Sequence, residues 1–514
     1  MCDQLRADYL SCYGHLKLHT PNIDSLAERG VRFDNAYCQA PLCGPSRASF
    51  YTGRYMSSHG VMANEDATRI DEMTLADYLR PSGYRTALVG KTDNRKSLEQ
   101  IKALGIDPDS ELARNAKSGG FEPFDHHEGL YPRGSDNPYS NFLRAKGYGG
   151  DNPWHEFANS GEDRDKNIRS GWRMRNCVYP ARIKEEYSET AYSTRRAIDF
   201  LEQQEGDRPW CLHLSYIKPH WPLIAPAPYH ERYRVEDIQP VVRDPCELDD
   251  PHPVYQAFMN QEYSESFHRD DVREKVIPVY MGLIKQIDDR LGRLFEYMKE
   301  RYLFENTMIV FTSDHGDYLG DHWLGEKDLF HEPSAKIPLI IYNPNQTAAD
   351  TRGSVCSAPV EAIDLIPTFV EYAGGKINHE RLEGRSLMPL LRSHQAPAEW
   401  RKYAVSEIDY SDRGPRSLLN LPPYDCRAVM IREKRWKYIH YNLYRPQLFD
   451  LVNDPRELHD LGEDPEYSKV RAGMQKLLID WRRRLKPRTG MPYDNLAGMG
   501  PERDESLGIV IGRW

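Results

Sequence analysis

The stretch TMIVFTSDHGD, residues 307–317, joins a short apolar run to a polar, acidic tip. An apolar run of this kind fits a strand that is buried on both faces of a parallel sheet. It follows a long amphipathic stretch from Asp271 to Tyr302 that predicts a helix. Ligands of α/β folds bind beyond the carboxyl ends of the strands, so Asp314 and His315 are expected at a functional edge of the sheet.

Helices and apolar strands alternate on both sides of this stretch. Strands are expected at VRFDNAYC (31–38), RTALVG (85–90), WCLHLSYI (210–217) and IPLIIYNP (337–344), and helices at 22–29, 189–204 and 360–372. This order is typical of an α/β fold with a large, mostly parallel sheet sandwiched by helices. Residues 92–187 interrupt the order, because they are polar and rich in Gly, Asn and Arg, and they predict a long irregular insertion rather than sheet.

The pattern changes after about residue 395. The segments KYAVSEI, RAVMIREKRWKYIHY and LFDLVND predict antiparallel strands, and a helix is expected over 468–485. We therefore expect a large α/β domain over residues 1–395 and a smaller α+β domain, with an antiparallel sheet and an extended tail, over residues 396–514.

The composition excludes several classes of protein. The 514 residues include 78 acidic and 68 Lys or Arg side chains, and this mild excess gives no footprint for nucleic acid or anionic lipid. No window approaches the roughly 18 apolar residues that a membrane helix needs. The nine scattered cysteines form no C-x-x-C pair, which argues against a disulfide framework, and no secretory signal is visible. A folded cytoplasmic protein with no nucleic-acid or membrane partner is expected.

The segment PLCGPSRASFYTGR, residues 41–54, carries the strongest chemical signal. Cys43 stands just before Pro45, which suits the first turn of a helix, so its side chain is expected at a helix N-terminus where free N–H groups favour anions. The plainer interpretation is a loop cysteine before an ordinary helix. A protein-phosphatase cysteine needs an arginine six residues later, and Ser49 occupies that position, which excludes this chemistry.

The pattern C-x-P-S-R followed by T-G-R resembles the signature of the sulfatase family, within the alkaline phosphatase superfamily. Further family patterns follow in the expected order, namely DQLRAD near the start, HGVMAN (59–64), GKT (90–92), KPHWP (218–222), SDHGDYLGDH (313–322) and GEKDLFHE (325–332). The DQ start and the GIVIGRW ending are most similar to the branch of phosphonate monoester hydrolases and bacterial arylsulfatases. The resemblance implies an alkaline-phosphatase-like fold and a Cys43 that a formylglycine-generating enzyme converts to formylglycine, whose hydrated aldehyde is the nucleophile.

The resemblance also implies a site for one divalent metal ion. An isolated Asp-His pair is more often a hydrogen-bonded loop, but the other family motifs favour metal ligands here. The expected ligands are Asp3, Gln4, Asp314, His315 and an oxygen of modified Cys43. This mixed set of oxygen and imidazole donors fits Ca²⁺ or Mn²⁺, and the family branch favours Mn²⁺.

Other positions receive roles at the ester by resemblance. Arg47 would contact the formylglycine, and Lys91 and Lys327 would hold the ester oxygens. His220 would protonate or stabilise the leaving group. The plainer interpretation is that Lys91 and Lys327 are solvated surface charges and that His220 is a packed structural histidine.

Two polar residues, Asn64 and Thr92, match residues that line the same pocket in the phosphonate hydrolase branch. Four other histidines are expected to be structural: His126, His127, His322 and His331.

Two departures from the family pattern affect these expectations. Only Met1 and Cys2 precede Asp3, so either the sequence begins inside a longer reading frame or the central strand is nearly missing and Asp3 is poorly anchored. Position 93 is Asp where many sulfatases place a histidine, which leaves the base for the product-release step unassigned.

Sulfate monoester hydrolysis ranks first, because sulfatases carry a lysine at the position of Lys91 where phosphonate monoester hydrolases carry tyrosine. Hydrolysis of a phosphonate monoester or phosphodiester at the same site ranks second. The remaining alternative is an inactive anion-binding relative with an unmodified Cys43. We expect a small-molecule sulfate or phosphonate ester as substrate and a homo-oligomeric assembly.

Overall fold

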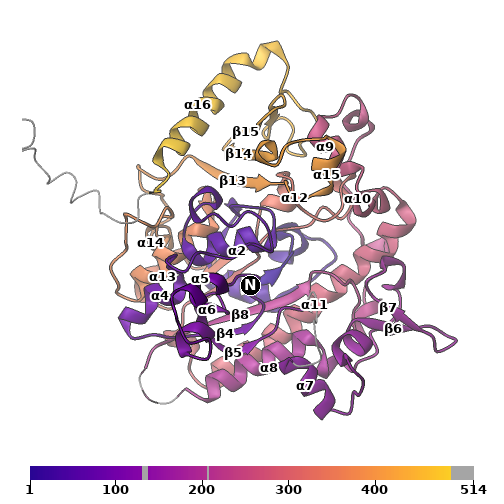
Figure 1. The fold of residues 1–514 in the computed structure, drawn as a ribbon, viewed down its shortest axis with the longest axis vertical. Coiled ribbons are helices and arrows are strands. Elements are labelled where there is room, and N and C mark those ends of the chain that lie inside the picture. The colour runs from indigo at the N-terminus through magenta and orange to yellow at the C-terminus, as the bar shows by residue number, and fades with distance from the viewer. Residues whose placement is uncertain (130–136, 205, 207, 488–514) are drawn as a thin grey trace, which may run out of the picture.

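A computed structural model describes residues 1–129, 137–204, 206 and 208–487 of the chain. Its central sheet collects strands from distant parts of the sequence (Figure 1). Parallel strands lie in the order β1 (Cys2–Asp3), β8 (Trp210–Pro219), β4 (Arg85–Gly90) and β5 (Glu122–His126). A second group has the order β11 (Ser354–Cys356), β2 (Val31–Phe33), β10 (Leu339–Tyr342) and β9 (Ile309–Thr312). A parallel bridge between Cys2 and Ser313 joins the two groups, which gives one mixed, mostly parallel sheet.

Helices cover both faces of this sheet, which confirms the expected sandwich. The first face is packed by α1 (Pro21–Arg29), α8 (Glu189–Glu202) and α11 (Asp270–Glu300), and the second by α2 (Cys43–Thr52), α4 (Leu75–Leu79) and α13 (Leu365–Tyr372). Neighbouring strand residues alternate between the two cores: Ala87 faces the first and Leu88 the second. This alternation is the two-residue period of a strand that is buried on both faces.

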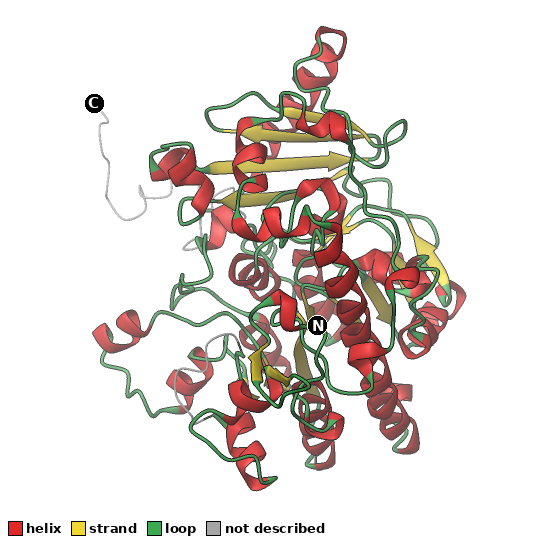
Figure 2. Ribbon diagram, turned by 90° about the vertical axis from the view of Figure 1, so that its right-hand side faces the viewer, coloured by secondary structure: helices red, strands yellow, loops and turns green. Residues whose placement is uncertain are grey.

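A separate antiparallel sheet forms the C-terminal part of the described chain, in the upper part of Figure 2. Its order is β13 (Tyr403–Asp409), β14 (Arg427–Glu433), β15 (Trp436–Tyr441) and β16 (Gln447–Asp450). Met430 on one face packs towards Tyr318 of the larger N-terminal part, and Ile431 on the other packs with Trp481 of α16 (Ser468–Arg484). The predicted antiparallel sheet is confirmed. The boundary at residue 395 stays a prediction, and the predicted tail after residue 487 lies outside the described residues.

The prediction of an irregular insertion over 92–187 is partly wrong, because β5 lies within it and pairs with β4 at the edge of the main sheet. The β5 sequence EPFDH lacks an apolar run, since an edge strand tolerates proline and faces less of the core. The same region also forms α5 (Leu98–Ala103), α6 (Glu111–Ala116), α7 (Pro138–Ala145) and a hairpin of β6 (Ser160–Glu162) with β7 (Ile168–Ser170).

Two shorter predictions also need correction. The strand expected over 31–38 is split by a turn into β2 and β3 (Ala36–Tyr37). The helix expected over 360–372 begins only at Leu365, because β12 (Val360–Glu361) first pairs with β3. Two-residue strands are too short to produce a recognisable period in the sequence.

The remaining α-helices are short and lie in the connections between strands. They are α3 (Met56–His59), α9 (Pro253–Met259), α10 (Glu262–Phe267), α12 (Glu332–Ala335), α14 (Met388–Arg392) and α15 (Gly414–Leu418). None of the helices in the described part of the chain has the length and apolar character needed to span a bilayer.

Candidate functional site

Cys43 is the first residue of α2 and is fully buried. The backbone N–H of Gly44 donates to Asn64 Oδ1 at 2.8 Å, so Asn64 anchors the start of the helix. A Cβ on Gly44 would lie 2.8 Å from the Asn64 Cα, which explains why a glycine follows the cysteine. The expected position of Cys43 at a helix N-terminus is confirmed.

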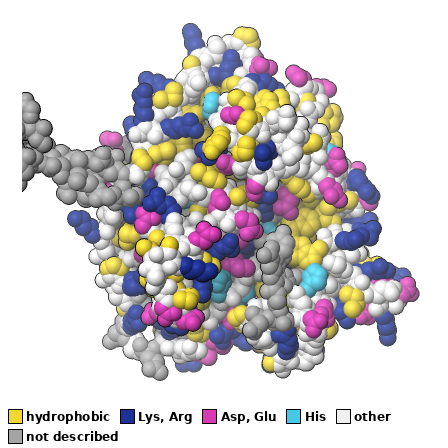
Figure 3. Space-filling model, viewed as in Figure 1, with side chains coloured by type: hydrophobic (Ala, Val, Ile, Leu, Met, Phe, Trp, Pro, Cys, Tyr) yellow, Lys and Arg dark blue, Asp and Glu magenta, His cyan; other side chains and the backbone are white. Residues whose placement is uncertain are grey.

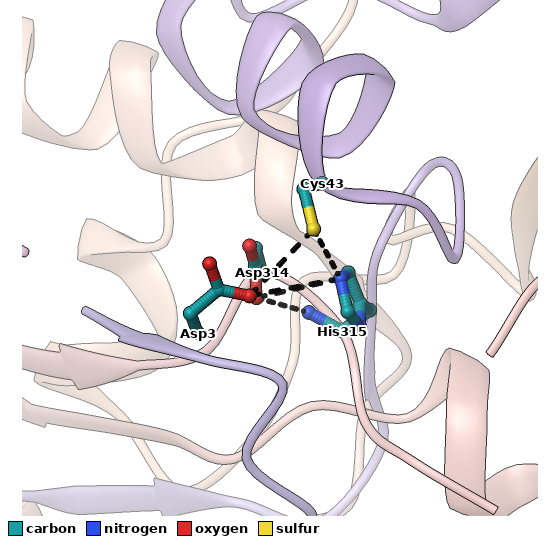
Figure 4. A group of neighbouring side chains, drawn as sticks. All are labelled: Asp3, Cys43, Asp314 and His315. Atoms are coloured by element: carbon teal, nitrogen blue, oxygen red, sulfur yellow. Dashed lines mark hydrogen bonds and ion pairs between the residues drawn. The ribbon is translucent and has the colours of Figure 1, made fainter. Parts of the chain in front are cut away.

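The fold brings Cys43 together with three of the four other expected metal ligands. Atoms of Asp3, Cys43, Asp314 and His315 that can bind a metal all lie within 4.8 Å of one another (Figure 4). The Cys43 Sγ lies 3.1 Å from His315 Nε2 and 3.6 Å from Asp3 Oδ1. Asp3 ends β1 and Asp314 follows β9, so the bridge between these neighbouring strands produces the cluster.

The chemistry of this cluster suits a divalent ion. The His315 Nδ1–H donates to the Gly316 carbonyl at 2.9 Å, which leaves Nε2 as the lone-pair nitrogen that faces the cluster. Two carboxylates and one imidazole are donors that Ca²⁺, Mn²⁺ and similar ions accept. Asp3 is 0% exposed despite the shortness of β1, which disagrees with the alternative in which Asp3 is poorly anchored.

Gln4, the fourth expected ligand, lies beside the cluster in a left-handed backbone conformation with φ 62°. Its side-chain oxygen accepts a hydrogen bond from Lys327 Nζ at 2.8 Å, and its Nε2 donates to Asp317 at 2.5 Å. These bonds define which end of the amide is oxygen. Its assignment as a metal ligand stays a prediction.

Arg47 holds the two carboxylates of the cluster from the α2 side. Its Nε donates to Asp314 Oδ2 at 2.7 Å, and its Nη1 donates to the Lys91 carbonyl and to Ser215 Oγ, both at 3.0 Å. Its Nη2 lies 3.5 Å from Asp3 Oδ2 and has no hydrogen-bond partner, although the side chain is fully buried. A buried donor without an acceptor is costly, so Nη2 is available to an acceptor that enters the site.

Lys91 supplies a second buried positive charge. Its Nζ lies 2.5 Å from Asp3 Oδ2 and 3.3 Å from Asp93 Oδ2. Burial alone would lower the pKa of Lys91, but the charges of Asp3 and Asp93 raise it well above its ordinary value. Burial alone would likewise raise the pKa of Asp3, yet Lys91 holds it well below its usual range. Both groups are therefore charged near neutral pH.

Lys327 and His220 form a pair on the substrate side. The His220 Nδ1–H donates to the Trp221 carbonyl at 3.0 Å, and His220 Nε2 accepts from Lys327 Nζ at 3.1 Å. Burial and the adjacent charge of Lys327 lower the pKa of His220 well below its usual value. Lys327 is therefore the member of the pair that carries the proton.

Sequence reasoning missed Glu128, which stands just after β5. Its carboxylate accepts hydrogen bonds from Thr92 Oγ1 at 2.7 Å and from the Asp93 backbone N–H at 2.9 Å, and it also pairs with His126. Glu128 therefore holds the loop that carries Lys91, Thr92 and Asp93. The rule that singled out Asp314, an acid after a strand, also identifies Glu128 once β5 is recognised.

The four histidines expected to be structural are not members of the cluster of Asp3, Cys43, Asp314 and His315. His127 is buried between Asp125 (2.9 Å) and Ser193 (3.0 Å). His322 and His331 stack with ring centroids 4.0 Å apart beneath the C-terminal sheet. These contacts agree with the structural roles expected for them, and His126 acts through Glu128.

A cleft opens from this centre to the surface. Asn64, Asp93, Glu128, His220 and Lys327 line its inner part. Figure 3 shows this side of the molecule, with hydrophobic side chains gathered right of the centre and basic side chains beyond them. The cleft is the route by which an ester could reach the cluster.

Comparisons with known proteins agree with this geometry. The family model described as Sulfatase matches residues 1–375, and one described as N-sulphoglucosamine sulphohydrolase, C-terminal, matches residues 320–484. A multifunctional alkaline phosphatase superfamily protein of Trinickia caryophylli is 31% identical over 96% of this chain and 96% of its own length. An arylsulfatase of Clostridium perfringens is 28% identical over 93% of this chain and 92% of its own length. The solved phosphonate monoester hydrolase of Silicibacter pomeroyi superposes with a TM-score of 0.81 at 28% identity, over 94% of each chain.

Proposed function

The chain belongs to the sulfatase family, and on this basis we propose that it hydrolyses sulfate monoesters with an oxygen nucleophile made from Cys43 and one divalent metal ion. The observation that carries this proposal is the convergence of Asp3, Cys43, Asp314 and His315, with a buried arginine donor beside them that lacks an acceptor. A sulfuric ester hydrolase needs this combination of metal ligands, nucleophile and cations.

Modification of Cys43 would supply the nucleophile, and binding of a divalent ion would complete the site. A formylglycine-generating enzyme would convert Cys43 to formylglycine, whose hydrated aldehyde offers one hydroxyl for attack and a second for release of the product. A Ca²⁺ or Mn²⁺ ion held by Asp3, Gln4, Asp314, His315 and modified Cys43 would polarise an ester oxygen and lower the pKa of the attacking hydroxyl.

The residues of the chain supply positioning and protons. Arg47 uses its free Nη2 to stabilise negative charge on the nucleophile, while its other nitrogens keep Asp314 in place. Lys91 and Lys327 hold the nonbridging oxygens of the ester.

The leaving alcohol takes its proton from Lys327. His220 accepts a hydrogen bond from Lys327 and so fixes the direction of that ammonium group. Asp93, whose Oδ2 lies 3.3 Å from Lys91 Nζ without a hydrogen bond of good geometry, is the candidate base for the release step in place of the missing histidine.

A phosphonate monoester or phosphodiester is the second candidate substrate. The observation in its favour is the superposition on two phosphonate monoester hydrolases, with TM-scores of 0.81 and 0.79. Sulfate ranks first because Lys91 places a full positive charge where sulfatases carry one.

The test uses protein coexpressed with a formylglycine-generating enzyme. Mass spectrometry of the tryptic peptide 33–47 reports the modification, and rates with an aryl sulfate and a matched aryl phosphonate monoester, with Ca²⁺ or Mn²⁺ added to stripped protein, report the class and the metal. We expect formylglycine at Cys43 and faster turnover of the sulfate. Predominant phosphonate turnover would reverse the ranking, and an unmodified thiol in fully active protein would refute the proposed nucleophile.

A further inference from the structure

The cleft extends beyond the catalytic centre along a wall made by two segments. Residues Trp172–Arg175 contribute to its lining, together with Trp221 next to His220. The second segment is the start of α11 and the residue before it, of which Arg269, Asp271, Val272, Lys275 and Val276 line the cleft. The two segments touch, because Cys177 Sγ donates to the Lys275 carbonyl at 3.5 Å. Lys327 and His220 line the same cleft, so a leaving group that extends from Lys327 along the cleft would meet this wall, which we call the arginine wall.

Two arginines on this wall have no partner for their charge. Arg173 and Arg175 are exposed, and neither guanidinium makes a hydrogen bond or ion pair within the described part of the chain. The other Lys and Arg residues that line the cleft all have partners: Arg95, Lys117, Arg269, Lys275, Lys327 and Arg413.

The acidic group on the arginine wall is already occupied. Asp271 accepts two hydrogen bonds from Arg269, at 2.9 and 2.8 Å, and lies 3.7 Å from Lys275 Nζ. The lining residues of the wall thus include four cations, Arg173, Arg175, Arg269 and Lys275, against the single acid Asp271, so this part of the cleft is net positive. Such mutual repulsion is relieved when an anion binds.

The backbone beneath these arginines is firmly held. A Cβ on Gly171 would lie 2.8 Å from the Asn159 carbonyl oxygen, and Trp172 Nε1 donates to His155 Nδ1 at 3.2 Å. Met174 packs against the main hydrophobic core, and Asn176 Nδ2 donates to the Ser170 carbonyl at 2.8 Å. Because the backbone is already held, only the side-chain torsions of the two arginines have to be ordered on binding, which lowers its cost.

We propose that the arginine wall binds a second anionic group on the alcohol portion of the substrate. The substrate is then a monoester whose leaving group carries a ring, which lies against Trp172 and Trp221, and a sulfate or carboxylate, which Arg173 and Arg175 bind. Arginine suits this role because its planar fork matches the oxygens of both anions. The acidic Glu65 and Asp66 also line the cleft and disfavour orientations that bring the anion to them.

This inference depends on the proposed function for the bond that is cleaved, but its test separates the two. Two substrate pairs are compared: an aryl sulfate with a tethered carboxylate against its neutral methylamide, and a disulfated monosaccharide against its monosulfate. The pair that shows the larger effect identifies whether the ring is aryl or saccharide. The variants are Arg173→Gln/Arg175→Gln and the control Arg164→Gln, an exposed arginine of the same region that does not line the cleft.

We expect the matured enzyme to prefer the anion-bearing ester about tenfold in kcat/KM, equivalent to about 1.4 kcal/mol. The double variant should lose this preference and keep its rate with the neutral ester, whereas Arg164→Gln should retain it. The preference should also fall with added salt, because the arginines are exposed.

Binding of the same esters to the Cys43→Ala protein provides a readout that needs no turnover. Equal binding and turnover of both members of each pair would refute anion binding by the arginine wall and leave the proposed hydrolysis intact. Absence of turnover with intact charge-selective binding would overturn the hydrolysis and leave the anion site standing.

Discussion

Replacing Glu128 with alanine tests whether this residue, which no family motif marks, positions the catalytic loop. The carboxylate accepts two short hydrogen bonds, from Thr92 Oγ1 at 2.7 Å and from the Asp93 N–H at 2.9 Å, and a longer one from the Thr92 N–H at 3.3 Å. Hydrogen bonds to charged groups contribute roughly 1.5–3 kcal/mol each when buried. The Glu128 side chain is 40% exposed, so water replaces part of this contribution.

We therefore assign about 1 kcal/mol to each of the two short hydrogen bonds, or about 2 kcal/mol in total. We call this pair of bonds from Glu128 to the loop the clamp. Loss of this free energy would displace Lys91 and Thr92 from the ester and lower kcat/KM by about 30-fold. Glu128→Gln keeps one acceptor oxygen and loses the charge, so we expect a decrease of about fivefold.

The assay is steady-state turnover of an aryl sulfate by matured, metal-loaded enzyme across a range of pH. The control is Glu122→Gln on the same strand, whose carboxylate pairs with Arg85 at 2.6 Å and does not line the cleft. A positioning residue should change the rate and leave the shape of the pH profile unchanged. A Glu128→Ala enzyme within about twofold of the wild type would refute the clamp, and a changed profile would mean that Glu128 itself transfers a proton.

Three further perturbations test other parts of the structure. Asp314→Asn should abolish turnover and lose the bound metal, as measured by elemental analysis of the folded protein; retained metal would contradict the ligand set. His59 is buried and neutral, because burial and then Arg54 lower its pKa to about 3. The unfolded chain therefore takes up a proton below about pH 6.5 that the folded chain does not, and stability should fall as the pH drops, by about 2 kcal/mol at pH 5 from this residue. His59→Gln should flatten the dependence of Tm on pH between about 6 and 4, and an unchanged slope would contradict this assignment. Arg401 lies 2.6 Å from both Glu361 and Asp364, and Arg401→Ala should cost about 3–5 kcal/mol by leaving buried carboxylates unpaired, with a fall in Tm of several degrees in calorimetry; an unchanged Tm would contradict it.

The sequence allowed accurate prediction where the signal is local. The apolar run before Asp314 identified β9, and the first turn of α2 followed from Pro45, two residues after Cys43. The strand β5 was missed because its sequence has no apolar period, and with it the role of Glu128. Such an edge strand becomes visible only through its pairing with β4.

By itself the sequence determined the alternation of helices and strands and the chemical identity of the groups at the strand ends. Each of these depends on residues that are close together in the chain, where propensity and period act. The family resemblance implied that Asp3, Cys43 and Asp314 share one site, and the tertiary structure brings them together. Tertiary structure alone decided that Arg47 keeps a donor without a hydrogen bond, and that Lys327 rather than His220 holds the proton. The physical reason is that distances between strands and the desolvation of charges depend on partners hundreds of residues apart, and no local pattern encodes them.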